Sequence, residues 1–340
     1  MITFNVLFIP GSVARLLPFA LSLLQGSGAR IRVVANGCRP DEVDLMRAAT
    51  RVDERVSHHV LPQRGPIPHG QALNHLFEVF DEPYFAIADS DVIAAGDFMD
   101  SLAPIPPGTA LFSGTPVWAT DDEAVCPPGA RFLTGRQRVL HDGTPVGSSY
   151  VAIYERAAIE PLWRQAPRGF GATFHYSLPR PMRDSLSARG WRFQIVDSCR
   201  LVNLLLLVNG SRLENRPVPE LHHLGGYSGR AFKSSRVRLR SLLRSRDDRW
   251  LQRIVESALL TLHARLRRDP ERSRMDERRR IVLPYVDAVL DAILADRPRP
   301  PAPRTDSADV DRRVAALGSA LEGHYRPGLS ALSEATRGSA

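Results

Sequence analysis

One segment, Tyr84–Val92 (Tyr-Phe-Ala-Ile-Ala-Asp-Ser-Asp-Val), constrains the fold of this chain more than any other. Its apolar run ends in two carboxylates one residue apart, Asp89 and Asp91, and it follows the turn-prone residues 81–83. Such a run predicts a buried strand of a parallel sheet that is covered on both faces. Ligands of open α/β sheets bind at the carboxyl ends of these strands. Two carboxylates close together there indicate a hard divalent cation that carries a diphosphate, and an ordinary Asx turn is the alternative.

Length and composition indicate a globular protein. The chain has 340 residues, 43% hydrophobic and 24% charged, enough for one large α/β domain with an appendage or for two domains. No apolar run reaches the ~20 residues that span a bilayer, and the N-terminus lacks the basic and cleavage-site pattern of a signal peptide. Three cysteines without a Cys-x-x-Cys pair argue against a disulfide framework or zinc site, and they predict a reducing, cytoplasmic setting: Cys38, Cys126 and Cys199.

The charge balance carries less information. The net charge is +8 and the pI about 10.0, which is compatible with nucleic-acid or acidic-membrane binding. Lys233 is the only lysine, and the positive charge is almost wholly arginine beside abundant alanine and proline. Because this bias is as much genomic as functional, we do not expect a nucleic-acid partner.

Strand and helix patterns alternate before Asp89. Strands are predicted at Thr3–Pro10, Ile31–Ala35 and Ser57–Leu61, and helices at Val13–Leu24, Asp41–Val52 and Gln71–Phe80. This alternation predicts an α/β fold with a Rossmann-like, mostly parallel sheet and flanking helices. No Gly-x-Gly-x-x-Gly follows the first strand, and no Gly-Lys-Ser/Thr loop occurs, so the usual dinucleotide and P-loop folds are excluded.

The second half is richer in loops. Residues 98–150 hold many Pro and Gly residues and are a region suited to a second substrate. Strands are predicted at Ala110–Gly114, Ser149–Tyr154, Trp191–Val196 and Leu201–Val208, with helices at Glu155–Arg164 and in a segment that ends at Gly190.

The character of the chain changes after Gly229. Residues 230–250 hold eight basic side chains, and residues 250–266 carry one apolar helical face. A second helix at Ile281–Leu294 precedes a Pro-rich linker at Arg297–Arg304. The last segment, Ser307–His324, is predicted to be a helix with a frayed tail.

Five motifs occur in the order and at the spacing of the GT-A-fold glycosyltransferases, and the chain resembles their family 2 type. They are Ile9-Pro10, Val33–Gly37, His69–Asn74, Asp89-Ser90-Asp91 and the late His-Leu-Gly-Gly-Tyr-Ser segment. The resemblance covers residues 3–228. It implies a catalytic domain at 1–228, with a nucleotide-binding half at 1–100 and an acceptor-binding half at 101–228. A basic helical extension at 229–296 and a Pro-rich linker and tail at 297–340 follow.

The resemblance implies a hexosyltransferase that uses a UDP-sugar, of the glucose or N-acetylglucosamine type, with Mn²⁺ or Mg²⁺. By position, Asp89 faces the ribose and a metal-bound water and is also a candidate metal ligand, and Ser90 lies beside it at the nucleotide. Asp91 binds the ion that bridges the diphosphate. His223 matches the family's late metal-binding histidine, with His222 as the alternative. The acceptor is a small molecule or is tethered to a carrier protein.

Further nucleotide-binding residues are implied by position. Pro10, Gly11 and Arg15 lie where the nucleotide passes. Asn36 stands where the family often has an Asp near the base, which leaves the uracil contact open. His69-Gly70 resembles the Lys-Gly of the retaining glucosyl-3-phosphoglycerate synthase group, and Asn74 closes that motif. Gly169-Phe-Gly resembles the group's Gly-Tyr-Gly.

The catalytic base is an open question in the sequence. Inverting members of the family place a carboxylate base before the last strand, but Thr173–Pro181 contains none. Asp184 is the nearest carboxylate and His175 the nearest imidazole, while Asp121, Asp122 and Glu123 are further alternatives. A retaining enzyme needs no base at that place.

Two other functions remain open. A nucleotidyltransferase shares a metal site at a sheet edge, although Pro10–Arg15 is a poor version of its Gly-rich loop. A non-catalytic binding module would use the basic extension to dock an acidic partner. The extension itself is a packed helical cap, a peripheral contact with anionic lipid or a docking site for an acidic carrier protein. The sequence indicates no oligomeric state.

Overall fold

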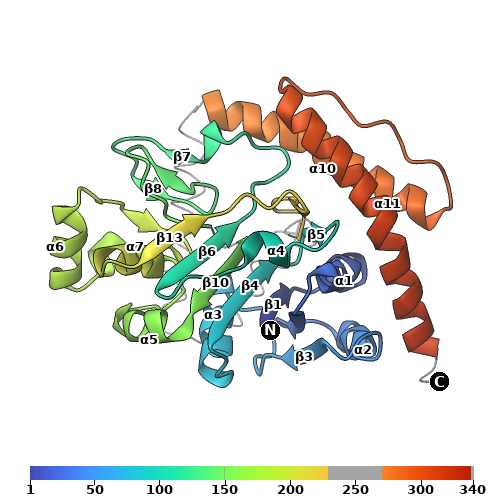
Figure 1. Cartoon of the computed structure of the whole chain (residues 1–340), viewed down its shortest axis with the longest axis horizontal. Coiled ribbons are helices and arrows are strands. Elements are labelled where there is room, and N and C mark those ends of the chain that lie inside the picture. Colours follow the sequence, from blue (N-terminus) through green and yellow to red (C-terminus); the bar gives the residue numbers. More distant parts are fainter. Residues whose placement is uncertain (149, 229–269, 338–340) are drawn as a thin grey trace.

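The computed structural model describes residues 1–148, 150–228 and 270–337. A seven-stranded central sheet has the order β13-β6-β10-β4-β1-β2-β3 (Figure 1). Strand β10 is antiparallel to both neighbours, and the other adjacent strands are parallel. The predicted α/β fold with a mostly parallel sheet is confirmed. The strands are β1 (Ile2–Phe8), β2 (Ala29–Ala35), β3 (Val56–Val60), β4 (Tyr84–Asp89), β6 (Thr109–Ser113), β10 (Val151–Glu155) and β13 (Arg212–Asn215).

Helices cover both faces of the sheet because its strands are apolar on both sides. Phe4, Val6 and Phe8 of β1 belong to one buried cluster, and Phe85 and Ile87 of β4 belong to the other. Side chains alternate along a strand, so these clusters lie on opposite faces. The flanking helices are α1 (Val13–Ser22), α2 (Pro40–Ala49), α3 (His69–Val79), α5 (Arg156–Gln165), α6 (Arg180–Ala188) and α7 (Arg200–Val208).

The strand prediction for Leu201–Val208 is wrong, because this segment is helix α7 (Arg200–Val208). A short, continuous apolar run has neither period 2 nor period 3.6, so its pattern does not separate a buried strand from a buried helix. The helix is buried from Arg200 to Leu206. The last strand of the sheet is instead β13, a short polar segment that the sequence did not reveal.

Several other predicted boundaries change. Trp191–Val196 contributes only β12 (Ile195–Val196), in a small sheet with β8 (Phe132–Leu133) and β11 (Thr173–Phe174). The strand expected over Tyr84–Val92 ends at Asp89, and β5 (Val92–Ala94) pairs separately with β14 (Leu221–His223). The remaining short elements are α4 (Met99–Leu102), β7 (Val125–Cys126), β9 (Val139–Leu140) and 3₁₀ turns at Leu23–Gln25, Asp122–Ala124 and His175–Ser177.

Two C-terminal helices, α10 (Pro270–Leu294) and α11 (Ala308–Arg337), pack on the side of the sheet that carries α1 and α2 (Figure 1). Phe19 of α1 meets Tyr325 of α11 edge to face, with ring centroids 5.5 Å apart. Both helices are longer than predicted. Helix α10 begins before Ile281, and α11 continues to Arg337 where a frayed tail was expected. No helix in the described ranges is long and apolar enough to cross a membrane.

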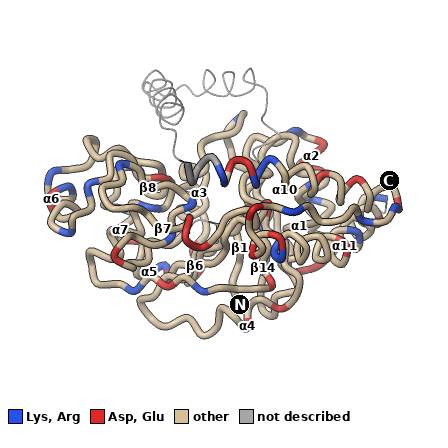
Figure 2. Tube along the Cα trace, turned by 90° about the horizontal axis from the view of Figure 1, so that it is seen from above, with Lys and Arg blue, Asp and Glu red and all other residues tan. Residues whose placement is uncertain are grey.

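Between Arg274 and Arg280, helix α10 carries two acidic residues, Asp276 and Glu277, with arginines on both sides of them (Figure 2). The basic stretch 230–250 and the helix predicted over 250–266 lie outside the described residues. The structure therefore bears on the extension only from α10 onward.

A buried ion pair fastens α10 to the α/β half. Arg278 is 7% exposed, and its Nη1 lies 3.0 Å from each carboxylate oxygen of Glu123. The same guanidinium donates to Asp306, which precedes α11, with Nη2 2.9 Å from Oδ2. One side chain thus joins the loop at Glu123, α10 and the segment before α11.

We expect Arg278→Gln to lower the free energy of unfolding by about 3 kcal/mol, because it leaves the buried Glu123 carboxylate without a cation. Urea unfolding followed by circular dichroism measures this loss. Arg280→Gln, at an exposed position of the same helix, should stay within about 0.5 kcal/mol of the parent. Equal stability of both variants would contradict the anchoring.

Candidate metal and nucleotide site

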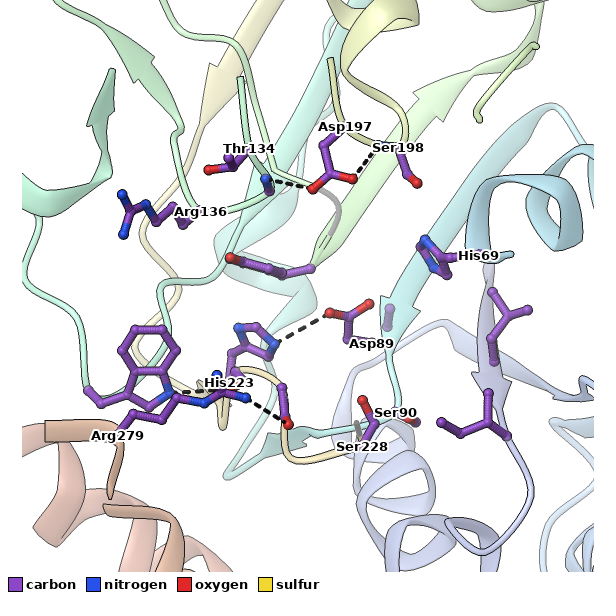
Figure 3. A pocket seen from close by; sticks show the side chains of 18 of the residues that line it. His69, Asp89, Ser90, Thr134, Arg136, Asp197, Ser198, His223, Ser228 and Arg279 are labelled. Atoms are coloured by element: carbon purple, nitrogen blue, oxygen red, sulfur yellow. Dashed lines mark hydrogen bonds and ion pairs between the residues drawn. The ribbon is translucent and has the colours of Figure 1, made fainter. Parts of the chain in front are cut away.

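A cleft of about 640 Å³ opens at the carboxyl ends of β1 and β4. Its floor includes Leu7, Ala88 and Asp89. Thr134, Asp197 and Ser198 lie across it from Ser90 and Ser228 (Figure 3). Helix α10 provides part of another wall. The cleft thus lies where parallel α/β sheets bind their ligands.

Three side chains converge beside this cleft. Nε2 of His223 lies 3.3 Å from Oδ1 of Asp91 and 3.4 Å from Oδ2 of Asp89. Ligand atoms of these residues all lie within 4.8 Å of one another. They are the only group of three or more His, Cys, Asp or Glu residues in the described ranges with metal-ligand spacing. We refer to them as the Asp-Asp-His cluster.

The strand pair β5–β14 brings His223 to the two aspartates. His223 lies opposite Val92 in this antiparallel pair, and the N–H of Leu224 donates to the backbone oxygen of Asp91 at 2.9 Å. The imidazole also packs on Tyr150, with ring centroids 4.0 Å apart. Hydrogen bonding and ring packing therefore fix the position of His223.

His222 does not join the cluster. It precedes His223 in β14, so its side chain points to the opposite face of the strand. Burial lowers the pKa of His222; the charge of Glu220 opposes this shift, and the charge of His324 in α11 adds to it. Of the two histidines that the sequence offered, His223 is the one beside the aspartates.

Asp91 is a buried charge with fixed hydrogen-bond donors. Its side chain is 1% exposed, and its Oδ2 accepts hydrogen bonds from the N–H groups of Tyr227, at 2.7 Å, and Ser228, at 3.3 Å. Gly225 and Gly226, with φ of 69° and 79°, make the turn that aims these donors. A side chain at Gly225 would also collide with Trp118.

Electrostatics couple the cluster. Burial alone raises the pKa of a carboxyl, but the charge of His223 and the backbone N–H donors hold the pKa of Asp91 below its usual range. Burial disfavours the imidazolium, yet the neighbouring charges of Asp91 and Asp89 raise the pKa of His223 to about 9. In the protein alone, a protonated His223 therefore partly balances two carboxylates.

The cluster fits a divalent cation. Asp91 Oδ1 and His223 Nε2 are buried and have no well-directed hydrogen-bond partner among the described residues, although they lie 3.3 Å apart. Adjacent ligand atoms at about 2.1 Å from one ion lie roughly 3 Å apart. Carboxylate and imidazole donors suit Mn²⁺ and, less well, Mg²⁺.

Four of the sequence-predicted nucleotide residues line the cleft: Asn36, His69, Asp89 and Ser90. The side-chain amide of Asn36 is hydrogen-bonded to the backbone of Ile67: its Nδ2 donates to the carbonyl oxygen, and its Oδ1 accepts from the N–H, both at 2.8 Å. Asn74 does not line the cleft, and its side-chain oxygen accepts hydrogen bonds from Trp163 Nε1 and the N–H of Phe170, both at 2.8 Å. Its contacts hold the loop that contains Gly169-Phe-Gly171.

The segment after β1 does not supply cleft residues beyond Ile9. The N–H of Gly11 donates to Glu42 at 2.6 Å. Arg15 pairs with Asp291 at 2.9 Å and with Asp287 at 3.4 Å, both on α10. Gly11 therefore contacts α2 and Arg15 contacts α10, and neither they nor Pro10 line the cleft.

The acidic and imidazole groups proposed as bases lie away from the cleft lining. Asp184 is exposed on α6, 3.6 Å from Arg180. His175 belongs to a 3₁₀ turn, with a buried Nε2 that has no partner among the described residues. Asp121 pairs with Arg138 and Glu123 pairs with Arg278. Asp122 begins the 3₁₀ turn Asp122–Ala124.

Sequence reasoning missed four charged residues that line the cleft: Arg136, Asp197, Asp276 and Arg279. Asp197 accepts from the N–H groups of Gly135, at 3.0 Å, and Ser198, at 2.8 Å. It follows the predicted strand that ends at Val196, so the rule that singled out Asp89 could have found it. Arg279 lies in a charge-rich stretch of α10, and no sequence signal separates it from its neighbours.

No protein-family model and no curated protein matches this chain. Similar solved structures include a mannosyltransferase from Pyrobaculum calidifontis in complex with GDP-Man and Mn²⁺, at 11% identity and a TM-score of 0.43 over 98% of this chain and 86% of that one. TarS from S. aureus is 12% identical with a TM-score of 0.41, over 100% of this chain and 92% of that one. These likenesses are too remote to assign an activity, so the functional conclusion depends on the residues of the cleft.

Gly70, at the start of α3, packs directly against the backbone of the loop that contains Phe170 and Gly171. A Cβ at this position would lie 2.4 Å from the backbone oxygen of Phe170 and 2.5 Å from Cα of Gly171. We expect Gly70→Ala to lower the free energy of unfolding by about 1–3 kcal/mol, because backbone must move to make room. Gly65→Ala, which meets nothing within 4 Å, is the matched control. Equal melting temperatures for the two variants would disprove this close contact.

Proposed function

We propose that this protein is a metal-dependent GT-A glycosyltransferase that moves a sugar from a nucleoside-diphosphate donor to a small-molecule or carrier-bound acceptor. The Asp-Asp-His cluster at the carboxyl ends of β1 and β4 carries the proposal. UDP-glucose and UDP-N-acetylglucosamine are the proposed donor type, following the family resemblance of the sequence. Mn²⁺ is the proposed ion, with Mg²⁺ as a weaker substitute.

In this proposal the cluster binds the ion, and the residues beside it bind the nucleotide. Asp91 and His223 hold the ion, and Asp89, the most exposed of the three, lies nearest the donor. When bound, the ion neutralises charge on the departing diphosphate. Asn36, His69 and Ser90 lie along the nucleotide side of the cleft, and Asn36 acts there by fixing the backbone at Ile67.

The acceptor side of the cleft holds Asp197, for which we propose the task of general base. Two backbone N–H groups fix its carboxylate, and its exposed side chain lines the cleft opposite Ser90 (Figure 3). A fixed carboxylate near the acceptor can remove the hydroxyl proton as the new bond forms. Asp184 and His175 remain the alternatives, and a retaining enzyme would depend on none of the three.

The nucleotidyltransferase alternative is weaker. That class uses a basic residue after the first strand to hold a triphosphate, and here Arg15 is engaged with Asp287 and Asp291. A binding module that docks through residues 230–250 predicts that the cluster is dispensable. Nucleotide-sugar binding and turnover distinguish these functions from glycosyl transfer.

We expect Asp91→Asn to abolish Mn²⁺-dependent hydrolysis of the donor, with a loss of at least about hundredfold, because the ion loses a charged ligand. A panel of UDP- and GDP-sugars with Mn²⁺ measures slow hydrolysis by release of the nucleoside diphosphate. Asp142→Asn, at an exposed turn outside the cleft lining, controls for lost surface charge. Full activity of Asp91→Asn, or no activity of the parent on any donor, would refute the proposal.

We expect Asp197→Asn to reduce glycosyl transfer by at least about hundredfold while Mn²⁺-UDP binding changes less than about threefold, because a base acts on the acceptor and not the donor. Calorimetry measures binding, and transfer is followed with the acceptor that the donor panel identifies. Asp184→Asn and His175→Gln are made in parallel. If either of these loses transfer while Asp197→Asn keeps it, the assignment of the base moves to that residue.

A further inference from the structure

Helix α10 is part of the cleft as well as a cap. Met275, Asp276 and Arg279 line the cleft, and Figure 3 shows Arg279 on the side that holds His223. The C-terminal segment therefore places a positive charge beside the Asp-Asp-His cluster. The proposed function so far assigns nothing to it.

Arg279 is held where it is by neutral contacts. Its Nη2 donates to the backbone oxygen of Gly226 at 3.2 Å, and its guanidinium carbon lies 5.8 Å from the ring centroid of Trp118. A Cβ at Gly226 would lie 2.5 Å from Nη2, so glycine is needed for this approach. The next residue, Tyr227, donates its N–H to Asp91. Arg279 and Asp91 therefore bind to neighbouring residues of the same turn.

Arg279 differs from its neighbour Arg278 in its ion-pair partners. Arg278 is satisfied by two carboxylates, Glu123 and Asp306. Arg279 is half-buried, and no carboxylate in the described ranges lies within ion-pair distance of it. Asp276 also lines the cleft but makes no ion pair with it. A partly buried guanidinium without an anion is costly unless a ligand supplies one.

We propose that Arg279 binds a phosphate oxygen of the donor diphosphate, so that α10 completes the donor site. This inference rests on the proposed function. A guanidinium offers five N–H donors in a planar fork, and the backbone oxygen of Gly226 accepts from only one nitrogen. The remaining donors match phosphate oxygens. Met275 contacts Arg136, a second cleft guanidinium, with Nη1 3.3 Å from Sδ, so α10 also positions a second cation.

The experiment compares Arg279→Gln with the parent in calorimetry, using Mn²⁺ alone, Mn²⁺ with UDP, Mn²⁺ with GDP and Mn²⁺ with inorganic pyrophosphate. We expect binding of all three phosphate ligands to weaken by about tenfold to hundredfold, which is the effect of one charge-assisted contact. Binding of Mn²⁺ alone should change less than about twofold. Arg279→Lys should recover part of the loss, since the charge returns without the fork.

Arg280→Gln, at an exposed position outside the cleft lining, is the matched control and should bind all ligands as the parent does. Parent-like affinity of Arg279→Gln for UDP, GDP and pyrophosphate would overturn the inference. So would a melting temperature lowered as far as that of Arg278→Gln, or an equal loss for Mn²⁺ alone, because both indicate support of the fold or the ion. If the parent itself binds no Mn²⁺-nucleotide, the proposed function fails instead.

Discussion

The buried charge of Asp91 is the constraint on which the architecture of this site depends. A carboxylate that is 1% exposed is stable only when neighbours compensate its charge and satisfy its lone pairs. Two backbone N–H groups from the turn at Tyr227 and Ser228 satisfy one oxygen, and His223 faces the other. Residues distant in sequence are thereby tied to the end of β4.

That tie links the sheet to the C-terminal helices. The Gly225-Gly226 turn that serves Asp91 also contacts Arg279 on its other side. Next to it, Arg278 fastens α10 to Glu123 and Asp306. Two adjacent arginines thus have different surroundings, one enclosed by carboxylates and one open to the cleft. The helices are therefore coupled to the site by position and by charge.

Sequence reasoning located the parts of the fold with a clear period. The strands and helices before Asp89 follow an apolar alternation that local chemistry sets, so their ends shift by only a few residues. The strand assigned to Leu201–Val208 failed because burial on most sides removes the period on which such predictions rest. Strand β13 was not predicted, for the opposite reason. Its polar residues carry no strand signal, and its pairing with β6 depends on the rest of the sheet.

The candidate site divides in the same way. Sequence reasoning selected Asp89, Asp91 and His223 as candidate metal ligands from their residue types, and the structure places their ligand atoms within 4.8 Å of one another. The roles of the surrounding residues could not be predicted. Arg15 forms ion pairs with α10, and Asn74 is hydrogen-bonded to the loop before Gly171. Arg279 reaches the cleft only because α10 packs as it does. Such contacts depend on tertiary structure, which spacing along the chain does not encode.

The proposed chemistry requires that the Asp-Asp-His cluster hold a divalent cation. A crystal structure of the protein grown with Mn²⁺ and UDP, with anomalous data collected at the manganese edge, tests it most directly. We expect one strong anomalous peak between Asp89, Asp91 and His223, with diphosphate oxygens beside it. Bound UDP with no peak at the cluster, or with its manganese held elsewhere, would show that the cluster is not the metal site.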